Sequence, residues 1–443
     1  MGSEMLRNVL MNLPMNRRSF LQHTALGVGS LCIANISLGG SRRISPNEKL
    51  NLAVIGVAHQ GASDMGQLES ENIVALCDVD ANYLTAAAQK HPGAKTYSDF
   101  RRLLDQKGID AVLVATPDHT HAVAAVAAMK SGYHVYCEKP LTRTISECRK
   151  VMETARKMKR VTQIGTQIHG GDNYRRVVEL VQSNAIGPVS EVHVWVEAVY
   201  GTKDRPQQGV PVPSELHYNL WLGPVAERPY SPDYVPRSWR NWWAFGGGSL
   251  ADFGCHFMDL PHWALDLRTP LTVEVLDGPP PRNEAVPPWM IVRYEYPARK
   301  SQPPAVLTWY HGGRKPSADV LAPEYAAKWN SGVLFVGKNG QLLSDYGRHL
   351  LLPEKQFEGF VRPAPFIPNS IGHYKEWAQA CKTGAATTCN FEYSGALTES
   401  VLLGNVAHRC QCKIEWDTKH LRSRNCKQAE EFIQHHYRKG WKL

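Results

Sequence analysis

The chain has 443 residues, of which 43% are hydrophobic and 21% charged, and this composition is typical of an ordinary globular protein long enough for two domains. The net charge of +9 is concentrated at the two ends, because residues 1–43 hold five arginines and one acid, and residues 413–443 hold eight basic and four acidic residues. The body between them is nearly neutral and has neither a basic face nor an aromatic–basic repeat, which excludes nucleic-acid binding.

An arginine pair near the N-terminus is the first recognisable signal. The pair lies within Asn16–Gln22 and precedes a weakly apolar stretch over residues 24–38 that is rich in Gly, Ala and Ser. This pattern is typical of a twin-arginine signal, whose pathway exports folded proteins. The 15-residue stretch is too short for a spanning helix. We therefore expect residues 1–43 to be a leader and the protein to be periplasmic, with no membrane anchor in its mature form; the start codon stays open.

A glycine-containing turn follows the first buried strand, which the apolar run Leu50–Val57 predicts. Residues 56–61 read Gly-Val-Ala-His-Gln-Gly, a G-x-G-x-x-G pattern in which Ala58 replaces the second glycine. Such turns place backbone N–H groups and a helix N-terminus against the pyrophosphate of a dinucleotide. Because the second glycine normally lets the backbone approach the phosphate, Ala58 predicts a slightly different phosphate placement.

Asp78 ends the next apolar run, Asn72–Val79, and lies 22 residues after Gly56. This is close to the spacing at which a carboxylate bonds the ribose hydroxyls in dinucleotide-binding folds. Its charge would repel a 2′-phosphate, so we expect NAD rather than NADP as the cofactor. The alternative is a solvent-exposed acid in a turn.

Strands and helices keep alternating through the first third of the chain. Ile109–Ala115 predicts a third buried strand, an alanine-rich helix follows, and Tyr133–Cys137 predicts another strand. Thr144 and Glu147 have the spacing of a capping box at the start of a further helix. This alternation predicts a doubly wound parallel sheet, a Rossmann domain over about residues 48–168.

The tripeptide Glu138-Lys139-Pro140 closes the strand Tyr133–Cys137. A lysine at the carboxyl end of a strand in such a sheet points into the crevice where these folds bind ligands. The proline ends the strand and fixes the turn. On its own the tripeptide is typical of an ordinary turn. The glycine-containing turn at residues 56–61 makes a functional role for it more credible.

Beyond residue 170 the pattern changes to strands with few helices between them. Val189–Tyr200 alternates like a long half-exposed strand. Four later runs also predict strands: Leu271–Leu276, Met290–Tyr296, Ala305–Tyr310 and Gly332–Val336. We expect an α/β domain over residues 169–412 with a large, mostly antiparallel open sheet, whose exposed face is expected to join a homodimer or homotetramer, followed by a basic tail over residues 413–443.

Asp252 and His256 lie four residues apart, on one face of a predicted helix that runs to about Leu267. Three glycines and a serine lead into this helix, which lets a substrate or a backbone approach closely. An Asp–His pair on a buried helix is either structural or functional. The insertion before it, residues 201–245, is rich in Pro and Trp, and its tryptophans are either core residues or surfaces that stack on a sugar.

The ten cysteines show no metal-ligand spacing. Cys410 and Cys412 are two residues apart, which is too close for a Cys-x-x-Cys pair, and no second pair lies nearby. Cys77 and Cys137 end apolar runs, where a thiol acts as a small hydrophobic group. We therefore expect neither a structural metal nor a dense disulfide framework.

Taken together, these motifs resemble the glucose–fructose oxidoreductase/inositol dehydrogenase family, often written Gfo/Idh/MocA, over about residues 48–412. The matching positions are the Gly56–Gly61 turn, Asp78, Thr116-Pro117 with His121, Glu138-Lys139-Pro140, and Asp252 with His256. The leader and the C-terminal stretches are similar to a secreted subgroup of that family. The resemblance implies an NAD-binding Rossmann domain joined to an α/β domain that commonly forms dimers or tetramers.

The resemblance also implies roles for individual residues. Lys139 would hydrogen-bond the reacting substrate hydroxyl, His256 would be the acid/base, and Asp252 would bind or orient beside it. The cofactor would be held by Gly56, Gln60, Gly61, Asp78, Thr116, His121, Glu138 and Gln167. These roles suit the residue types, because imidazole accepts a proton near neutrality and a lysine cation stabilises a developing alkoxide.

Three functions are open on the sequence. The first is an exported NAD-dependent oxidoreductase of a sugar, polyol or sugar derivative, with a tightly held cofactor because free NAD is scarce outside the cytoplasm. The second is an NAD-dependent glycoside hydrolase, similar to α-N-acetylgalactosaminidases, in which oxidation of the sugar is transient. The third, a non-catalytic sugar-binding protein, is disfavoured because Lys139, Asp252 and His256 occur together.

Overall fold

The computed structural model describes residues 45, 48–204, 208–300 and 302–443, all of which belong to one compact unit. The predicted leader, residues 1–43, lies outside the described residues. Within the described part of the chain, no helix combines the length and the apolar character needed to cross a membrane.

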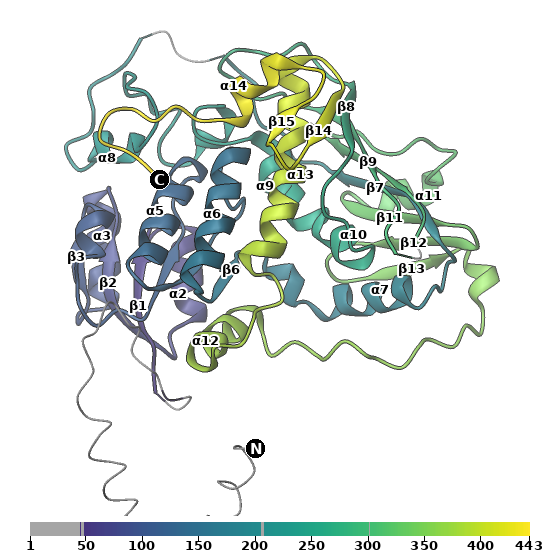
Figure 1. The fold of residues 1–443 in the computed structure, drawn as a ribbon, viewed down its shortest axis with the longest axis horizontal. Coiled ribbons are helices and arrows are strands. Elements are labelled where there is room, and N and C mark those ends of the chain that lie inside the picture. The colour runs from purple at the N-terminus through teal and green to yellow at the C-terminus, as the bar shows by residue number, and fades with distance from the viewer. Residues whose placement is uncertain (1–44, 46–47, 205–207, 301) are drawn as a thin grey trace, which may run out of the picture. The chain divides into compact units, whose positions relative to one another are not determined.

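The first half of the chain folds around a six-stranded, all-parallel sheet in the order β3-β2-β1-β4-β5-β6 (Figure 1). Its strands are β1 Asn51–Ile55, β2 Asn72–Cys77, β3 Lys95–Tyr97, β4 Ala111–Val114, β5 His134–Cys137 and β6 Thr162–Ile164. The order reverses between β1 and β4, and ligands bind at the carboxyl ends of the strands beside such a switch point. The predicted doubly wound parallel sheet is confirmed.

Helices cover both faces of this sheet, because its apolar strands expose hydrophobic side chains on each side. One face packs on α5 (Asp118–Lys130) and α6 (Ile145–Met158), and the other on α2 (Gln60–Gln67) and α3 (Ala81–Lys90). The short α4, Phe100–Leu103, lies between β3 and β4. Helix α6 begins with the predicted capping box, in which the Thr144 N–H donates to Glu147 Oε2 at 3.0 Å.

A helix from the C-terminal part of the chain completes the nucleotide-binding half. Helix α12, His373–Thr383, places the fully buried Trp377 against Leu52 and Val54 of β1. Gln163 of β6 donates through Nε2 to the carbonyl of His373 at 2.7 Å. The core of the first sheet therefore includes a helix that comes more than 200 residues after its last strand.

The second sheet has nine strands in the order β13-β12-β11-β7-β10-β9-β8-β14-β15. Its strands are β7 Val189–Val196, β8 Thr272–Asp277, β9 Met290–Tyr296, β10 Ala305–His311, β11 Gly332–Gly337, β12 Gly340–Ser344, β13 His349–Leu352, β14 Ile414–Asp417 and β15 Arg422–Ser423. Neighbouring strands are antiparallel except β7 and β10, which are parallel. The predicted large, mostly antiparallel sheet is confirmed.

One face of the second sheet forms the main hydrophobic core with four helices. Its other face is partly covered by residues 320–329. The helices are α7 Asp172–Gln182, α9 Gly248–Phe257, α10 Asp259–Ala264 and α13 Phe391–Cys410. On the opposite face, Leu321 and Trp329 cover Trp195 of β7 and Leu334 of β11. The face predicted to be open is therefore partly closed by the segment that contains α11, Pro323–Lys328.

Two predicted elements are shorter in the structure. Strand β7 ends at Val196 rather than Tyr200, and the single helix expected to run to Leu267 is divided into α9 and α10 at Met258. Pro261 explains the division, because it has no N–H to donate to the carbonyl four residues earlier, and its ring clashes with that carbonyl. The remaining helices are α8 Tyr218–Leu222 and α14 Glu430–Ile433, with 3-10 turns η1 Gln167–Gly170, η2 Ser238–Asn241, η3 Glu354–Phe357 and η4 Lys427–Ala429.

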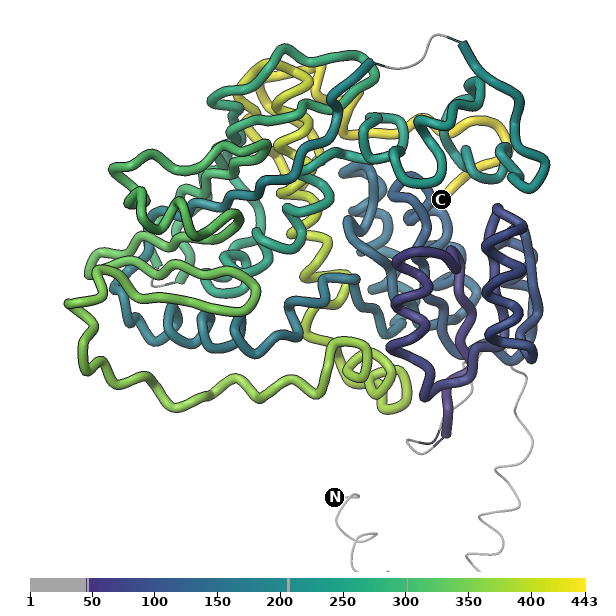
Figure 2. The backbone as a smooth tube through the Cα atoms, turned by 180° about the vertical axis from the view of Figure 1, so that it is seen from behind, coloured from purple at the N-terminus to yellow at the C-terminus, as the bar shows by residue number. Residues whose placement is uncertain are grey.

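The C-terminal segment, drawn in yellow, runs from the second sheet back to the nucleotide-binding half (Figures 1 and 2). Strand β14 adds to the edge of the second sheet beside β8. The chain then passes α14 and reaches the first half, where Tyr437 donates to Glu147 Oε1 at 2.6 Å. The basic tail expected from the sequence is thus part of the folded body.

Candidate active site

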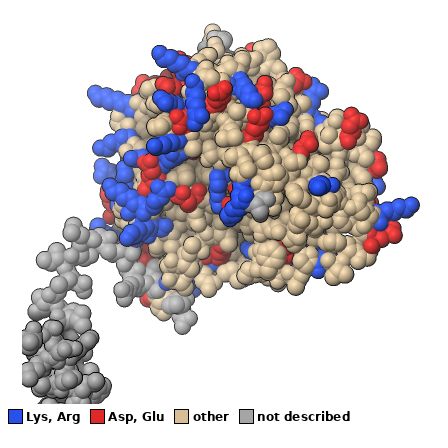
Figure 3. Space-filling model, turned by 45° about the vertical axis from the view of Figure 1, so that its right-hand side comes forward, with Lys and Arg blue, Asp and Glu red and all other residues tan. Residues whose placement is uncertain are grey.

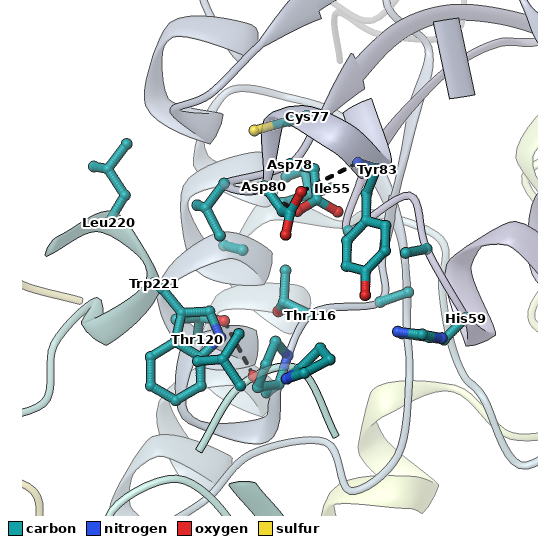
Figure 4. A pocket seen from close by; sticks show the side chains of 18 of the residues that line it. Ile55, His59, Cys77, Asp78, Asp80, Tyr83, Thr116, Thr120, Leu220 and Trp221 are labelled. Atoms are coloured by element: carbon teal, nitrogen blue, oxygen red, sulfur yellow. Dashed lines mark hydrogen bonds between the residues drawn. The ribbon is translucent and has the colours of Figure 1, made fainter. Parts of the chain in front are cut away.

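A cavity of about 560 Å³ lies at the carboxyl edge of the parallel sheet. Its floor contains residues that come one or two positions after the ends of four strands: Gly56 after β1, Asp78 after β2, Thr116 after β4 and Lys139 after β5. Figure 4 shows Asp78, Asp80 and Tyr83 on one side of the cavity, Trp221 and Thr120 on the other, and Thr116 between them. This position is the one that the topology predicts for a ligand.

The turn after β1 is packed so tightly that two of its residues must be glycine. Gly56 has a φ of +88°, and a Cβ there would meet the Ala115 carbonyl oxygen at 2.6 Å. A Cβ on Gly61, at the start of α2, would lie 2.0 Å from the Gly56 carbonyl oxygen. The N-terminus of α2 is thereby held against β1, with Ala58, His59 and Gln60 lining the cavity. Backbone N–H groups at such a helix end suit a pyrophosphate.

Asp78 closes the other end of this floor. Its Oδ2 accepts from the Val57 N–H and its Oδ1 from the Asp80 N–H, both at 3.0 Å. Burial, with a smaller contribution from the charge of Asp80, raises the pKa of Asp78. Each carboxylate oxygen can accept further hydrogen bonds, and the side chain lines the cavity. This placement suits the ribose-binding role predicted for it.

Thr116 and His121 organise the turn after β4 in different ways. Thr116 lines the cavity, and its hydroxyl oxygen is buried without a hydrogen-bond partner. His121 does not line the cavity, because its ring lies between the carbonyl oxygens of Pro140 and Thr116, at 2.8 and 2.6 Å. His121 therefore joins the turns after β4 and β5 behind the cavity.

Glu138 is a buried acid that lies close to a second one. Its Oε1 accepts from Gln167 Nε2 at 2.7 Å, and a Cβ on Gly165 would lie 2.1 Å from the same oxygen. Asp64 of α2 accepts from Tyr374 and Gln60, each at 2.7 Å. Burial, together with repulsion between the two carboxylates, raises the pKa of Glu138 well above its ordinary value. Glu138 lines the cavity, whereas Gln167 stands behind it and positions the Glu138 side chain.

This raised pKa predicts a pH-dependent stability. Unfolded Glu138 releases its proton near pH 4.5, while the folded protein retains it, so the contribution of Glu138 to the free energy of unfolding should fall as the pH rises above 4.5. One proton gives a slope no steeper than about 1.4 kcal/mol per pH unit. Glu138→Gln should remove this downward contribution, so the slope of its stability against pH, from urea denaturation between pH 5 and 8, should be more positive than that of the wild type. The exposed Glu69→Gln should keep the wild-type slope. An unchanged slope in Glu138→Gln would contradict the assignment.

Lys139 joins the two halves of the chain through a buried charge cluster. Its Nζ lies 2.5 Å from Asp252 Oδ1 of α9, and the two side chains are only 14% and 8% exposed. Arg240 Nε lies 3.1 Å from the same oxygen, and the Tyr200 hydroxyl donates to Asp252 Oδ2 at 2.8 Å. Burial alone would raise the pKa of Asp252, but the charges of Lys139 and Arg240 lower it well below its usual range. Asp252 is thus the permanent anion of the cluster.

His256 lies one turn after Asp252 on α9 and is partly exposed. Burial, with the nearby charge of Lys139, lowers the pKa of its imidazole to about 3. Its Nδ1 is buried without a hydrogen-bond partner, and its ring packs edge-on against Tyr346 with 6.1 Å between the ring centres. His256 does not line the cavity itself. At neutral pH the ring is uncharged and can accept a proton.

The insertion over residues 201–245 covers the cavity. It is tied to the turn after β2 by the Ala81 N–H to the Glu215 carbonyl, at 2.9 Å, and by the His217 N–H to the Val79 carbonyl, at 2.8 Å. Trp221 and Trp239 line the cavity, and the Arg240 guanidinium lies 4.1 Å above the Trp239 ring. Of the alternatives for the tryptophans, these two face the cavity, while Trp242 is a fully buried core residue.

The C-terminal tail supplies the last wall. Trp441 lines the cavity beside Phe100, and the guanidinium of Arg101 lies 4.7 Å from the centre of its ring. The tail reaches this point over the insertion, where Arg438 donates to the Gly223 carbonyl and to Asn219 Oδ1, both at 2.6 Å. A residue far beyond the Rossmann motifs therefore closes the end of the cavity near Asp78.

The predicted site residues lie in and around one cavity, but not all of them line it. Those that line the cavity are Gly56, Gln60, Asp78, Thr116, Glu138 and Lys139, while Gly61, His121, Gln167, Asp252 and His256 stand behind or beside it. Sequence reasoning missed Tyr200, Arg240 and Trp441. No spacing pattern in the sequence indicated Tyr200 or Arg240. The only signal for Trp441 was an aromatic residue among basic residues in the C-terminal tail. The roles predicted for individual residues stay predictions.

The residues present fit a dinucleotide. In the strand order β2-β1-β4, the residues that follow these strands are Asp78 with its carboxylate, Gly61 at the N-terminus of α2, and Thr116 with a buried hydroxyl that has no partner. The volume of about 560 Å³ falls within the range of small-molecule and cofactor sites. Lys139 then marks the end at which a substrate would meet the cofactor.

Comparison with known proteins agrees with this description. Residues 50–166 match the model of the oxidoreductase family Gfo/Idh/MocA, NAD-binding Rossmann fold, and residues 180–301 match the model of its C-terminal alpha/beta domain. Inositol 2-dehydrogenase of Salmonella typhimurium is 31% identical over 150 residues, which are 32% of this chain and 45% of that protein. Alpha-N-acetylgalactosaminidase of Shewanella oneidensis is 28% identical over 200 residues, 39% of this chain and 44% of that protein. The chain thus matches less than half the length of these curated relatives.

Solved structures share the fold at low sequence identity. The WlbA dehydrogenase of Bordetella pertussis, in complex with NADH and UDP-GlcNAcA, has a TM-score of 0.60 at 16% identity and covers 84% of this chain and 99% of its own. The aldose–aldose oxidoreductase of Caulobacter crescentus has a TM-score of 0.54 at 17% identity and covers 83% and 100%. These solved structures therefore have the same two-domain α/β fold as this chain.

Proposed function

The chain belongs to the Gfo/Idh/MocA oxidoreductase family, and from that premise we propose that it is an NAD-dependent oxidoreductase acting on a sugar, polyol or sugar derivative. The observation that carries the proposal is the Lys139–Asp252 pair, because it places a cation of the cofactor cavity against a helix of the second half. Its relatives and structural neighbours include proteins named for inositol and for aldoses.

Lys139 is the group that would contact the substrate hydroxyl. Its side chain lines the cavity and is 14% exposed, so a hydroxyl can reach its ammonium group. In this partly dry position the cation stabilises the negative charge that develops on the oxygen as its proton leaves. Asp252 fixes the ammonium direction, while Tyr200 and Arg240 fix Asp252. Bound NAD supplies the hydride acceptor.

His256 would take the proton that the hydroxyl loses. With a pKa of about 3 it is neutral throughout the working pH range, so it is never blocked by prior protonation. A base this weak can remove the proton only if the product alkoxide is stabilised. Lys139 provides that stabilisation and His256 provides the acceptor, so the two residues act together.

The proposal includes export and a tightly held cofactor. The twin-arginine pattern of the leader supports export, which places the protein where free NAD is scarce. Trp441 and the insertion cover the cavity on the sides not formed by the parallel sheet, which supports slow cofactor release. A retained cofactor would have to be reoxidised in place by a second substrate.

Replacing Trp441 by alanine should loosen the cofactor. Base–aromatic stacking is worth about 1–3 kcal/mol, so removal of the ring should raise the dissociation constant of NAD roughly tenfold. NAD content of the purified protein, released by denaturation and measured by absorbance, checks this. Trp441→Phe keeps a flat aromatic wall and should retain near wild-type NAD content. Equal content in the alanine and wild-type proteins would show that the tail does not hold the cofactor.

The proposed function is tested on the purified native protein. Denaturation should release nicotinamide, and a panel of sugars and polyols added to the intact protein should produce the absorbance of reduced cofactor for at least one compound. A protein that neither contains nor binds NAD would contradict the proposal. A protein that binds NAD but reduces it with none of the compounds would leave the cofactor assignment standing and overturn the substrate class.

The match to an alpha-N-acetylgalactosaminidase supports a second candidate, NAD-dependent glycoside cleavage. Lys139 and His256 serve that reaction equally, since oxidation of a sugar carbinol begins both. Aryl glycosides separate the two proposals: release of the aryl alcohol without net change in cofactor absorbance would favour cleavage. Net accumulation of reduced cofactor would favour the oxidoreductase.

Self-association through the second sheet also stays part of the proposal. Figure 3 shows broad areas with few charged side chains, while Lys and Arg gather toward one side of that view. Apolar side chains such as Val361, 88% exposed, and Phe366, 54% exposed, occur in the segment after β13. Sedimentation velocity should give a dimer or tetramer, and a monomer at micromolar concentration would contradict this part.

A further inference from the structure

Three cysteines converge at the C-terminal end of α13. Cys410 is the last residue of that helix, Cys412 follows two residues later, and Cys426 comes from the turn after β15. Their sulfur atoms all lie within 4.8 Å of one another. The sequence spacing of Cys410 and Cys412 predicted no metal site, but the third thiol changes the chemistry available here.

These thiols differ from the other cysteines that the structure describes. Six cysteines are buried one by one in the hydrophobic cores, where each packs as a small apolar group: Cys77, Cys137, Cys148, Cys255, Cys381 and Cys389. The three clustered thiols are instead only partly buried, at the rim of the main core. A group of three neighbouring thiols, two of which are partly exposed, is not explained by packing alone.

The backbone holds the three thiols in place. Gln411 has a φ of +51°, which reverses the chain after α13 and turns Cys412 back beside Cys410. Asn425 fixes the other side: its Nδ2 donates to the Lys413 carbonyl at 2.8 Å, and its Oδ1 accepts from the Glu415 N–H at 3.0 Å. The cluster is therefore set before any ligand arrives.

We propose that Cys410, Cys412 and Cys426 bind one thiophilic metal ion of the Zn²⁺ type. Tetrahedral Zn–S bonds of ~2.3 Å place sulfur atoms roughly 3.8 Å apart, which the cluster reaches with small side-chain rotations. Among the described residues no His, Asp, Glu or further Cys joins the group, so water completes the coordination. Binding forms three metal–sulfur bonds and releases the three thiol protons to solvent.

The bound ion would tie the C-terminal segment to the body of the protein. Cys426 lies in the chain that continues through α14 to Trp441, while Cys410 ends a helix of the main core. A cross-link here limits the freedom of the segment that leads to the cavity. The inference rests on the cysteine geometry alone and stands whether or not the proposed reaction is correct.

Cobalt and metal analysis of the full chain test the site. Protein purified with reductant should contain about one zinc per chain by elemental analysis, and after chelation Co²⁺ should restore a sulfur-to-metal charge-transfer band. Cys412→Ser and Cys426→Ser should each weaken Co²⁺ binding at least tenfold, and the buried Cys381→Ala should not. Far-UV circular dichroism confirms that each variant is folded.

Three results would count against the proposal. One is a disulfide between any two of the three residues in freshly prepared protein, seen as two thiols protected from alkylation until reduction. Another is three freely alkylated thiols with no cobalt band. Loss of the band in Cys381→Ala as well as in the serine variants would also count against it, because binding would then not require this cluster.

Discussion

Replacement of Lys139 by methionine is expected to lower the rate of cofactor reduction by substrate about 10³-fold, the size of the effect when one preorganised charge is lost from a transition state. Methionine keeps much of the lysine volume but has no positive charge. Asp252 remains partnered by Arg240 and Tyr200, so the fold should persist. Stopped-flow absorbance of the reduced cofactor, with any substrate found in the panel, measures the rate.

The NAD content of Lys139→Met separates this effect from a binding defect. It should match that of the wild type, because the turn after β1 and Asp78 lie at the other end of the cavity. Lys130→Met, which removes an exposed lysine at the end of α5, serves as the matched control and should leave the rate unchanged. A Lys139→Met rate above a tenth of the wild type would remove Lys139 from the proposed chemistry.

Asp252→Asn should cause the second large effect, a loss of about 3 kcal/mol from the free energy of unfolding. The substitution removes the carboxylate that pairs with both the ammonium of Lys139 and the guanidinium of Arg240. The two positive charges then lie close together without it. Removing one partner of a buried ion pair costs more than the pair contributes, because the remaining charge stays desolvated. Urea denaturation at pH 7 measures the loss, and the exposed Asp105→Asn should change it by less than about 0.5 kcal/mol.

The same variant carries a pH signature. The pKa of Asp252 is lowered in the folded protein, so its contribution is complete above its unfolded value of 3.8 and is lost as the pH falls through the lowered value. The stability difference between Asp252→Asn and wild type should therefore be constant from pH 5 to 7 and should narrow at strongly acidic pH. A difference that grows on acidification would contradict the assignment of Asp252 as the anion of the cluster.

Local patterns were enough to predict most of the architecture. Met290–Tyr296 forms a strand with the predicted bounds, and the capping box at Thr144 starts α6 as expected. Both signals are contained within a few residues. The strands β12 and β13 were missed because four- and five-residue runs joined by a tight turn are too short to show a period.

Only the part of the candidate site that lies in short sequence motifs could be predicted. Gly56, Asp78 and Lys139 follow strand ends, and the topology of a doubly wound sheet brings strand ends together. Nothing in one sequence places Arg240 beside Asp252, or Trp441 beside Phe100, because those contacts depend on how an insertion and a tail pack. The approach of Cys426 to Cys410 was missed for the same reason.

The helices that pack across both halves restrict how the protein can move. Trp377 of α12 is buried in the first sheet, and Arg149 of α6 donates to Glu399 of α13 at 2.8 Å. A hinge between the halves would have to break these contacts, so rigid-body opening of one half against the other is disfavoured. A substrate of the proposed reaction would therefore reach Lys139 past the lining that the insertion supplies, Leu216 to Arg240. Exchange of that substrate would then depend on surface loops rather than on domain closure.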